Sequence, residues 1–169
     1  MDPLKVSPDI LNAQEGKKLV IADLQIHSKY TRACSKNIRI ETLEEYGRIK
    51  GIDLLGVGDF QHPERREEID AKLTENDKGI LRTKTGFRFL WQTEVSLMYS
   101  QGGKRRAVHL LLFAPNKKRA DNITAYLASK GRLDYDGRPI FGISCRDLVK
   151  DLKAIDERIE IIPAHCMTP

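Results

Sequence analysis

The feature that most constrains the fold is a series of apolar segments separated by amphipathic ones. Segments of strand-like character cover residues 18–27, 52–60, 87–100, 104–115 and 158–165. Segments with helical periodicity or helix-start signals cover residues 40–51, 63–73, 116–130 and 143–156. Strands that alternate with helices predict an α/β fold with a mainly parallel sheet. A Gly-Gly pair at 102–103 predicts that the third and fourth strands form a hairpin.

Ligand-type side chains occur at matching places in these strands. Four of them fall near the C-terminal ends of apolar segments, namely His27, Asp59, Glu94 and His165, and His109 lies inside the run AVHLLLF. In a (β/α) barrel the reactive groups collect at the C-terminal ends of the strands. Burying such groups without partners would cost roughly several kcal/mol each, and a bound metal ion would remove that cost. The alternative interpretation is a purely structural polar cluster.

The chemistry of this set favours a metal site. Imidazoles and carboxylates without thiolates suit zinc, manganese or iron. A carboxylate such as Glu94 can bridge two ions, and ion pairs roughly 3.5–4 Å apart are common in enzymes that hydrolyse phosphate esters. The ligand set therefore predicts a metal site of a kind that is common in phosphoesterases.

Charge and composition indicate the partner and the compartment. The net charge is +5, and basic residues cluster around Lys29–Arg39, Lys104–Arg106 and Lys117–Arg119. This pattern favours a polyanion such as DNA, although a solvated surface would look similar. Three cysteines without a CxxC pair, and no apolar run near the roughly 18 residues of a membrane span, predict a cytoplasmic protein without membrane contact. No GxxxxGK[ST] loop occurs, so no ATP site is expected.

Several motifs together resemble the PHP (polymerase and histidinol phosphatase) superfamily, and within it the endonuclease Q-like branch. In family order they are DLQIHSKYTRACSKN, KGIDLLGVGDF, QTEVS, AVHLLLFAP, DGRPIFGIS and IPAHCMTP. The resemblance implies a distorted, TIM-like (β/α)7 barrel that holds two or three divalent ions, zinc, manganese or magnesium. It also implies a hydrolase that nicks DNA on the 5′ side of deaminated bases or abasic sites.

Carried over by position, the resemblance implies roles for individual residues. The implied metal ligands are His27, Asp59, Glu94, His109 and His165. Glu94 would be the bridging catalytic carboxylate, and Asp59 the acidic residue that ends the second strand. The basic residues expected to hold the phosphates of DNA are Lys29, Arg32, Lys36, Arg105, Arg106 and Arg138.

The sequence departs from the family pattern at three ligand positions, one of which is Ala33, where some members have another His. Gln25 stands where the opening motif usually has His, and it is either a weaker ligand or the sign of a missing ion. Phe60 stands where many members have a ligand His. His62 either substitutes for that ligand or helps to position the start of the following helix.

The length sets the last expectation. A (β/α) barrel typically needs about 250 residues, and the chain has 169. We therefore expect a polar N-terminal extension at 1–17 followed by the N-terminal portion of a PHP domain at 18–169. An open barrel edge would favour self-association. Two alternatives stay open, a small-molecule phosphatase on the same scaffold and an inactive metal- or DNA-binding fragment.

Overall fold

The structure, a computed structural model, describes residues 19–32 and 34–167. The predicted extension at 1–17 lies outside the described residues, as do Ala33 and the first residue of the strand predicted at 18–27. The helices are α2 (Ile40–Ile49), α3 (Pro63–Lys72), α4 (Lys117–Ala128) and α5 (Cys145–Ile155). The strands are β1 (Ala22–Asp23), β2 (Leu54–Gly56), β3 (Thr74–Glu75), β4 (Leu81–Arg82), β5 (Arg88–Gln101), β6 (Lys104–Ala114), β7 (Ile140–Phe141) and β8 (Glu160–Pro163).

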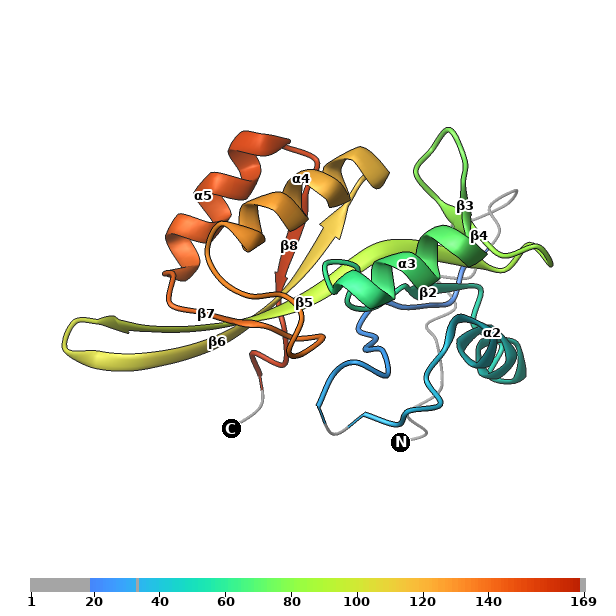
Figure 1. The fold of residues 1–169 in the computed structure, drawn as a ribbon, viewed down its shortest axis with the longest axis horizontal. Coiled ribbons are helices and arrows are strands. Elements are labelled where there is room, and N and C mark those ends of the chain that lie inside the picture. Colours follow the sequence, from blue (N-terminus) through green and yellow to red (C-terminus); the bar gives the residue numbers. More distant parts are fainter. Residues whose placement is uncertain (1–18, 33, 168–169) are drawn as a thin grey trace, which may run out of the picture.

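The long strand β5 is the spine of the sheet (Figure 1). Its first residues pair with β2 in parallel and with β4 in antiparallel orientation. Its remaining length pairs with β6 in antiparallel and with β7 in parallel orientation. Beyond these neighbours, β1 pairs in parallel with β2, and β8 pairs in antiparallel orientation with β6. Strands β1, β2, β3, β7 and β8 therefore run in the same direction as β5, and β4 and β6 run opposite to it. Within the described residues the sheet is not closed.

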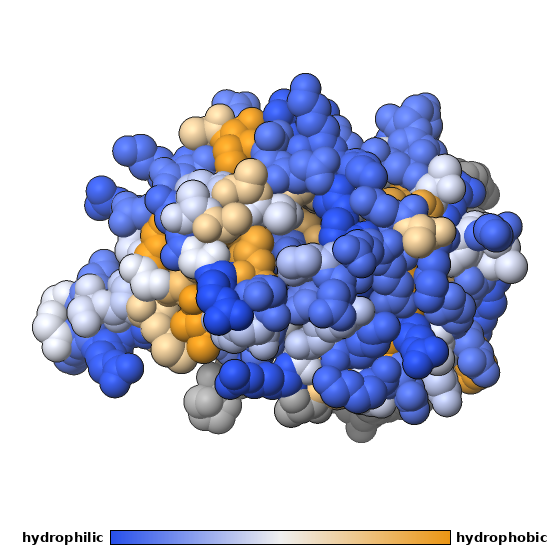
Figure 2. Space-filling view, viewed as in Figure 1, coloured by the Kyte–Doolittle hydropathy of each residue, from blue (hydrophilic) through white to orange (hydrophobic). Residues whose placement is uncertain are grey.

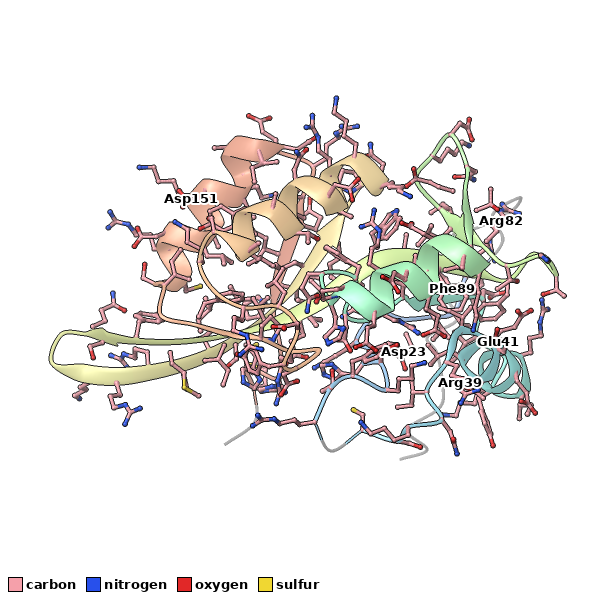
Figure 3. All side chains as sticks on the ribbon, viewed as in Figure 1. Asp23, Arg39, Glu41, Arg82, Phe89 and Asp151 are labelled. Atoms are coloured by element: carbon pink, nitrogen blue, oxygen red, sulfur yellow. The ribbon has the colours of Figure 1, made fainter. Side chains whose placement is uncertain are left out.

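The hydrophobic core lies between the sheet and the helices that cover it. Helices α4 and α5 pack on each other, and α4 also packs on β6 (Figure 1). Helix α3 meets the start of β5, where the guanidinium of Arg66 lies 4.6 Å from the centroid of the Trp91 ring. Phe89 lies where β5 passes α2 and α3 (Figure 3). Phe87, Phe89 and Trp91 are buried core residues, with exposed fractions of 5%, 0% and 0%.

A hairpin arm, residues 98–107 of β5 and β6, extends beyond the helices (Figure 1). Gly102 and Gly103 form its tip with positive φ angles of 59° and 72°, which glycine adopts readily. The hairpin predicted from this Gly-Gly pair is confirmed. Figure 2 shows a largely hydrophilic face, with apolar side chains gathered near the base of the arm. Met98 and Ile140 are exposed there, at 44% and 47%.

Two predicted strands are much shorter than the sequence pattern indicated. The strand predicted at 18–27 forms ladder pairs only at Ala22–Asp23, and the one at 52–60 only at Leu54–Gly56. Asp23 is exposed, and its carboxylate accepts a hydrogen bond from the Gln25 amide at 3.2 Å. This local turn takes the chain out of the sheet before His27.

The structure also contains elements that the sequence did not indicate. Strands β3, β4 and β7 are two-residue segments, too short to carry an alternating apolar pattern. The mixed α/β class is confirmed, but the prediction of a mainly parallel sheet is wrong for the described residues. The long β5–β6 ladder and the β3–β4, β4–β5 and β6–β8 pairings are antiparallel. Within the described residues, no helix is both long enough and apolar enough to cross a membrane.

Candidate metal centre

Glu94 is the centre of the candidate site. It lies in the middle of β5, and its side chain is completely buried. One carboxylate oxygen, Oε1, lies 3.1 Å from His109 Nδ1, 3.4 Å from Arg138 Nη1 and 4.0 Å from His165 Nε2. Glu94, His109 and His165 each offer a ligand atom within 4.8 Å of the others, an arrangement that can hold a divalent ion. We call these three residues the open side of the site.

Sheet register brings the open side together. Ser96 pairs with His109 across the β5–β6 ladder, and side chains two residues apart share a face of a strand. Glu94 and His109 therefore project from the same face. His165 follows β8, and the amide of Ala164 donates to the carbonyl of His109 at 2.9 Å. That bond brings the turn carrying His165 beside β6, where its Nε2 lies 2.9 Å from His109 Nδ1.

The other oxygen of Glu94, Oε2, faces the segment after β1. It accepts a hydrogen bond from Gln25 Nε2 at 3.1 Å and lies 3.3 Å from His27 Nε2. The second ring nitrogen of His27, Nδ1, lies 3.3 Å from Asp59 Oδ1. We call His27, Asp59 and Gln25 the closed side of the site.

Asp59 reaches this position through an unusual backbone conformation. Gly58 and Asp59 both have positive φ angles, 70° and 55°. At Gly58 a Cβ atom would lie 3.0 Å from the carbonyl oxygen of Ile26, so the end of β2 passes directly against the segment that leads to His27. Glycine is the residue that fits both this close approach and the positive φ. The tight turn aims the Asp59 carboxylate at residues 27–31.

Electrostatics couple the two carboxylates to His27. Burial alone would lower the pKa of His27, but hydrogen bonds and charge from Asp59 and Glu94 outweigh it and raise this pKa to about 9. Burial would raise the pKa of Glu94, yet His27, Gln25 and Arg138 bring it down to about 2. The pKa of His109 is lowered by burial and by the charge of Arg138. Glu94 is therefore ionised at neutral pH, and His109 favours the neutral form that binds metals.

The structure brings all five predicted ligand residues into this one site, together with Gln25 and Arg138. His62 takes a different place. It is the N-cap residue of α3, it is 4% exposed, and its ring stacks on Tyr30 with centroids 4.5 Å apart. Its side chain makes no capping hydrogen bond to α3. Phe60 lies in the core, where its ring packs edge-on against Trp91.

The predicted DNA-binding residues are spread around the site. Arg138 touches Glu94, and Arg32 lies 3.6 Å from Asp136 at the surface. Lys36 donates to the carbonyl oxygen of Lys29 at 3.4 Å in the same loop. Arg105 and Arg106 are exposed on the hairpin arm. Lys29 Nζ lies 3.7 Å from Glu68 Oε2. Of the predicted phosphate-binding residues, Arg138 is the one in contact with Glu94 within the part of the chain that the structure describes.

Sequence reasoning missed residues that support the closed side. Ser28 and Thr31 both hydrogen-bond to Asp59, and Gly137 packs against its carboxylate. The available signal was the pair of hydroxyl residues within four positions of His27, which can reach a nearby buried carboxylate.

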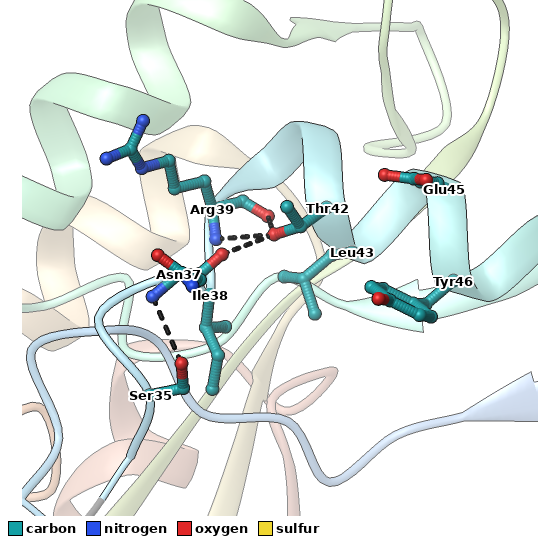
Figure 4. Close-up of a pocket in the computed structure, with 8 residues that line it drawn as sticks. All are labelled: Ser35, Asn37, Ile38, Arg39, Thr42, Leu43, Glu45 and Tyr46. Carbon is teal, nitrogen blue, oxygen red and sulfur yellow. Dashed lines mark hydrogen bonds between the residues drawn. The ribbon is translucent and has the colours of Figure 1, made fainter.

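A separate cavity of about 540 Å³ lies at the start of α2 (Figure 4). It is lined by Ser35, Asn37, Ile38, Arg39, Thr42, Leu43, Glu45 and Tyr46. Thr42 shapes its rim, because its hydroxyl donates to the carbonyl of Asn37 at 2.6 Å and accepts from the amide of Arg39 at 3.0 Å. None of the predicted metal ligands lines this cavity.

Comparison with solved structures identifies the fold. The chain is 27% identical to the lesion-specific endonuclease PfuEndoQ from Pyrococcus furiosus, with a TM-score of 0.77 over 89% of this chain and 35% of that one. It is 29% identical to an endonuclease Q solved with a duplex substrate carrying an abasic lesion at the active site, again with a TM-score of 0.77, over 89% of this chain and 36% of that one. The fold is endonuclease Q-like.

Sequence comparisons are less specific. No family model matches the chain. A curated relative, an uncharacterized protein of Methanocaldococcus jannaschii, is 28% identical over 151 residues. The match covers 87% of this chain but only 16% of that relative. The chain therefore spans about a sixth of the curated relative and about a third of the solved chains.

Proposed function

We propose that this chain forms part of a metal-dependent DNA-repair endonuclease of the PHP type, which nicks DNA on the 5′ side of deaminated bases or abasic sites. The observation that carries the proposal is the buried Glu94 with His109 and His165 around it, on a fold that resembles a lesion-specific endonuclease. The donor set fits a divalent ion, since it combines a buried carboxylate with two imidazoles.

Each residue has a proposed role in hydrolysis. Glu94, His109 and His165 would hold the metal, with His27 as a further ligand that the resemblance implies. A bound divalent ion supplies a hydroxide at neutral pH and offsets charge on the phosphate. Arg138, 3.4 Å from Glu94 and partly exposed, is placed to hold a non-bridging phosphate oxygen.

The hairpin arm is the proposed contact to the DNA backbone beside the cut. Arg105 lies four residues before His109 on β6 and therefore on the same face, roughly 13 Å away at the usual rise of a strand. Residues 95–115 contain no Asp or Glu, so nothing within the arm opposes its positive charge. Arg105 and Arg106 would bind phosphates and make the affinity salt-dependent.

The test is a nicking assay with duplex DNA containing uracil, hypoxanthine or an abasic site, in the presence of manganese or zinc. It uses the full-length protein that contains this chain. We expect nicking 5′ of the lesion, and its loss in Glu94→Gln. Glu45→Gln, on the exposed face of α2, is the matched control and should keep full activity. Cleavage of simple phosphomonoesters without any nicking of DNA would refute the proposal and favour a small-molecule phosphatase.

We also propose that residues 18–169 are the N-terminal portion of a (β/α)7 barrel. The support is that β1 and β8 each pair with a single strand among the described residues, which leaves one edge of each strand open there. Leu19, Val20, Ile21 and Ile162, near these edges, are 67%, 44%, 50% and 44% exposed. Further strands, or a second copy of the chain, would cover them. Light scattering on the 169-residue chain alone should therefore reveal self-association that the longer parent lacks.

A further inference from the structure

The carboxylate of Asp59 accepts more hydrogen bonds from the protein than the carboxylate of Glu94 does. Its side chain is fully buried. Oδ2 accepts three hydrogen bonds, from the Ser28 amide and the Ser28 hydroxyl at 2.6 Å each and from the Thr31 hydroxyl at 2.7 Å. Oδ1 faces His27 Nδ1 at 3.3 Å. A carboxylate oxygen that accepts three bonds has no lone pair left in a usable direction.

The backbone of Gly137 closes over this carboxylate. A Cβ atom at this position would collide with Asp59 Oδ2 and with the Thr31 hydroxyl. Gly137 is itself held in place, because its carbonyl accepts from Gln61 Nε2 at 2.6 Å and its amide donates to the carbonyl of Tyr30 at 3.1 Å. An ion could reach Oδ2 only by displacing a pinned backbone and leaving buried donors without acceptors.

We propose that Asp59 is a positioning residue and not a metal ligand: it fixes the ring of His27 through Nδ1, so that Nε2 faces Glu94. The inference rests on the proposed function, since it assumes a metal centre at Glu94. His27 Nε2 lies 3.3 Å from Glu94 Oε2, on the opposite side of the ring from Asp59. A carboxylate on the far nitrogen of a histidine is a common way to fix the orientation of that ring beside a metal.

Three further residues hold Asp59 in place, namely Ser28, Thr31 and Gly137. Thr31 supports two groups at once, since its hydroxyl donates to Asp59 Oδ2 and lies 3.3 Å from His27 Nδ1. Arg138 directly follows Gly137, so the glycine that covers Asp59 also places the arginine beside Glu94. One buried network thus positions both His27 and Arg138.

Metal stoichiometry and affinity separate a positioning residue from a ligand. The experiment measures zinc and manganese binding to the full-length protein by elemental analysis and titration calorimetry, together with its nicking activity. In Asp59→Asn we expect the same number of bound ions and an affinity weaker by about 10–100-fold. Thr31→Val should weaken binding in the same direction without changing the ion count, and Thr31→Ser should restore the wild-type affinity. Ser129→Ala, on the exposed end of α4, is the control and should change nothing.

Each outcome decides a claim. Loss of one ion in Asp59→Asn, with Thr31→Val unchanged, would make Asp59 a ligand and overturn the inference while the proposed function stood. A wild-type protein that binds neither ion would overturn both. Ion binding that responds to the variants as expected, without any nicking of lesion-containing DNA, would keep the positioning role of Asp59 and refute the proposed function.

Discussion

The two sides of Glu94 contain similar residue types but differ in how far their side chains are exposed to solvent. On the closed side, Asp59 is fully buried and the side chain of His27 is 20% exposed. On the open side, the side chains of His109 and His165 are 21% and 47% exposed, and that of Arg138 is 37% exposed. His27 and His109 are therefore exposed to the same degree, and Gln25 is exposed as well. The contrast lies in Asp59, which is buried and paired by protein donors, against His165 and Arg138, which solvent or a ligand can reach.

This difference separates stability from chemistry within one site. A buried carboxylate whose partners are all supplied by the protein contributes to folding, and removing it leaves several donors unpaired. Imidazoles that remain partly accessible contribute less to folding and can exchange water for a ligand. Mutations on the closed side should therefore mainly lower the unfolding free energy, and mutations on the open side should mainly weaken metal binding.

The largest effect on folding should come from Asp59→Ala. This change leaves the Ser28 amide, two hydroxyls and His27 without an acceptor in a buried site, which should cost about 3–5 kcal/mol of unfolding free energy. Urea denaturation of the metal-free protein measures this cost. A loss below about 1 kcal/mol would mean that Asp59 does not stabilise the closed side, and the proposed difference between the two sides would be refuted.

The next effect is a dependence of metal-free stability on pH. The pKa of His27 is raised from 6.5 to about 9, so its contribution is complete below about pH 6.5 and is lost as the pH rises through about 9. The pKa of Glu94 is lowered from 4.5 to about 2, so its contribution is complete above about pH 4.5 and is lost as the pH falls through about 2. Maximal stability should lie between about pH 4.5 and 6.5.

On either side of this window the loss should be on the order of 2–3 kcal/mol, counted once because His27 and Glu94 are partners. Urea denaturation across the pH range, with a chelator present, checks it. Glu94→Gln should flatten the acidic limb and reduce the basic one. A profile that Glu94→Gln leaves unchanged would assign the pH dependence to other groups.

The open side was easier to foresee from sequence than the closed side. Glu94 and His109 stand in long strands, where alternation and a Gly-Gly turn fix which side chains share a face. Asp59 and His27 were both predicted to lie in the candidate site, but their surroundings depend on loops. The positive φ of Asp59 and the packing of Gly137 on its carboxylate arise from contacts between segments about 78 positions apart, which no local pattern encodes.

The same reasoning explains the misjudged first strand. The run from 18 to 27 has the alternation of a strand, yet the only partner of β1 among the described residues is β2, through two ladder pairs. Local periodicity correctly indicated a strand in this segment. It did not indicate how many residues pair with the neighbouring strand, because that number is set by the turn at Asp23 and by the close approach of Gly58 to Ile26.

A smaller effect on folding, with a large effect on binding, should follow from His165→Ala. The side chain is 47% exposed, so its truncation should change the unfolding free energy by less than about 1 kcal/mol. Metal affinity should fall by about 100-fold or more, since one of three clustered ligand groups is removed. Calorimetric titration with zinc measures the change. A large loss of stability with unchanged zinc binding would reverse the assignment of the two sides.

The smallest effect on folding, and the sharpest probe of the comparison, is Gln25→His. Gln25 is exposed and donates through its amide nitrogen to Glu94 Oε2, so it fills that oxygen with a protein donor. An imidazole at this position offers a lone pair beside His27 Nε2 and Glu94 Oε2, and three such groups can hold an ion. The unfolding free energy should stay within about 0.5 kcal/mol of the wild-type value, and the number of bound ions should rise by one.

Gln25→Ala removes the hydrogen bond without adding a ligand and should leave the ion count unchanged. If Gln25→His binds no additional ion, hydrogen bonds alone do not keep ions from the closed side. The packing of Gly137 on Asp59 would then be the next feature to test by mutation.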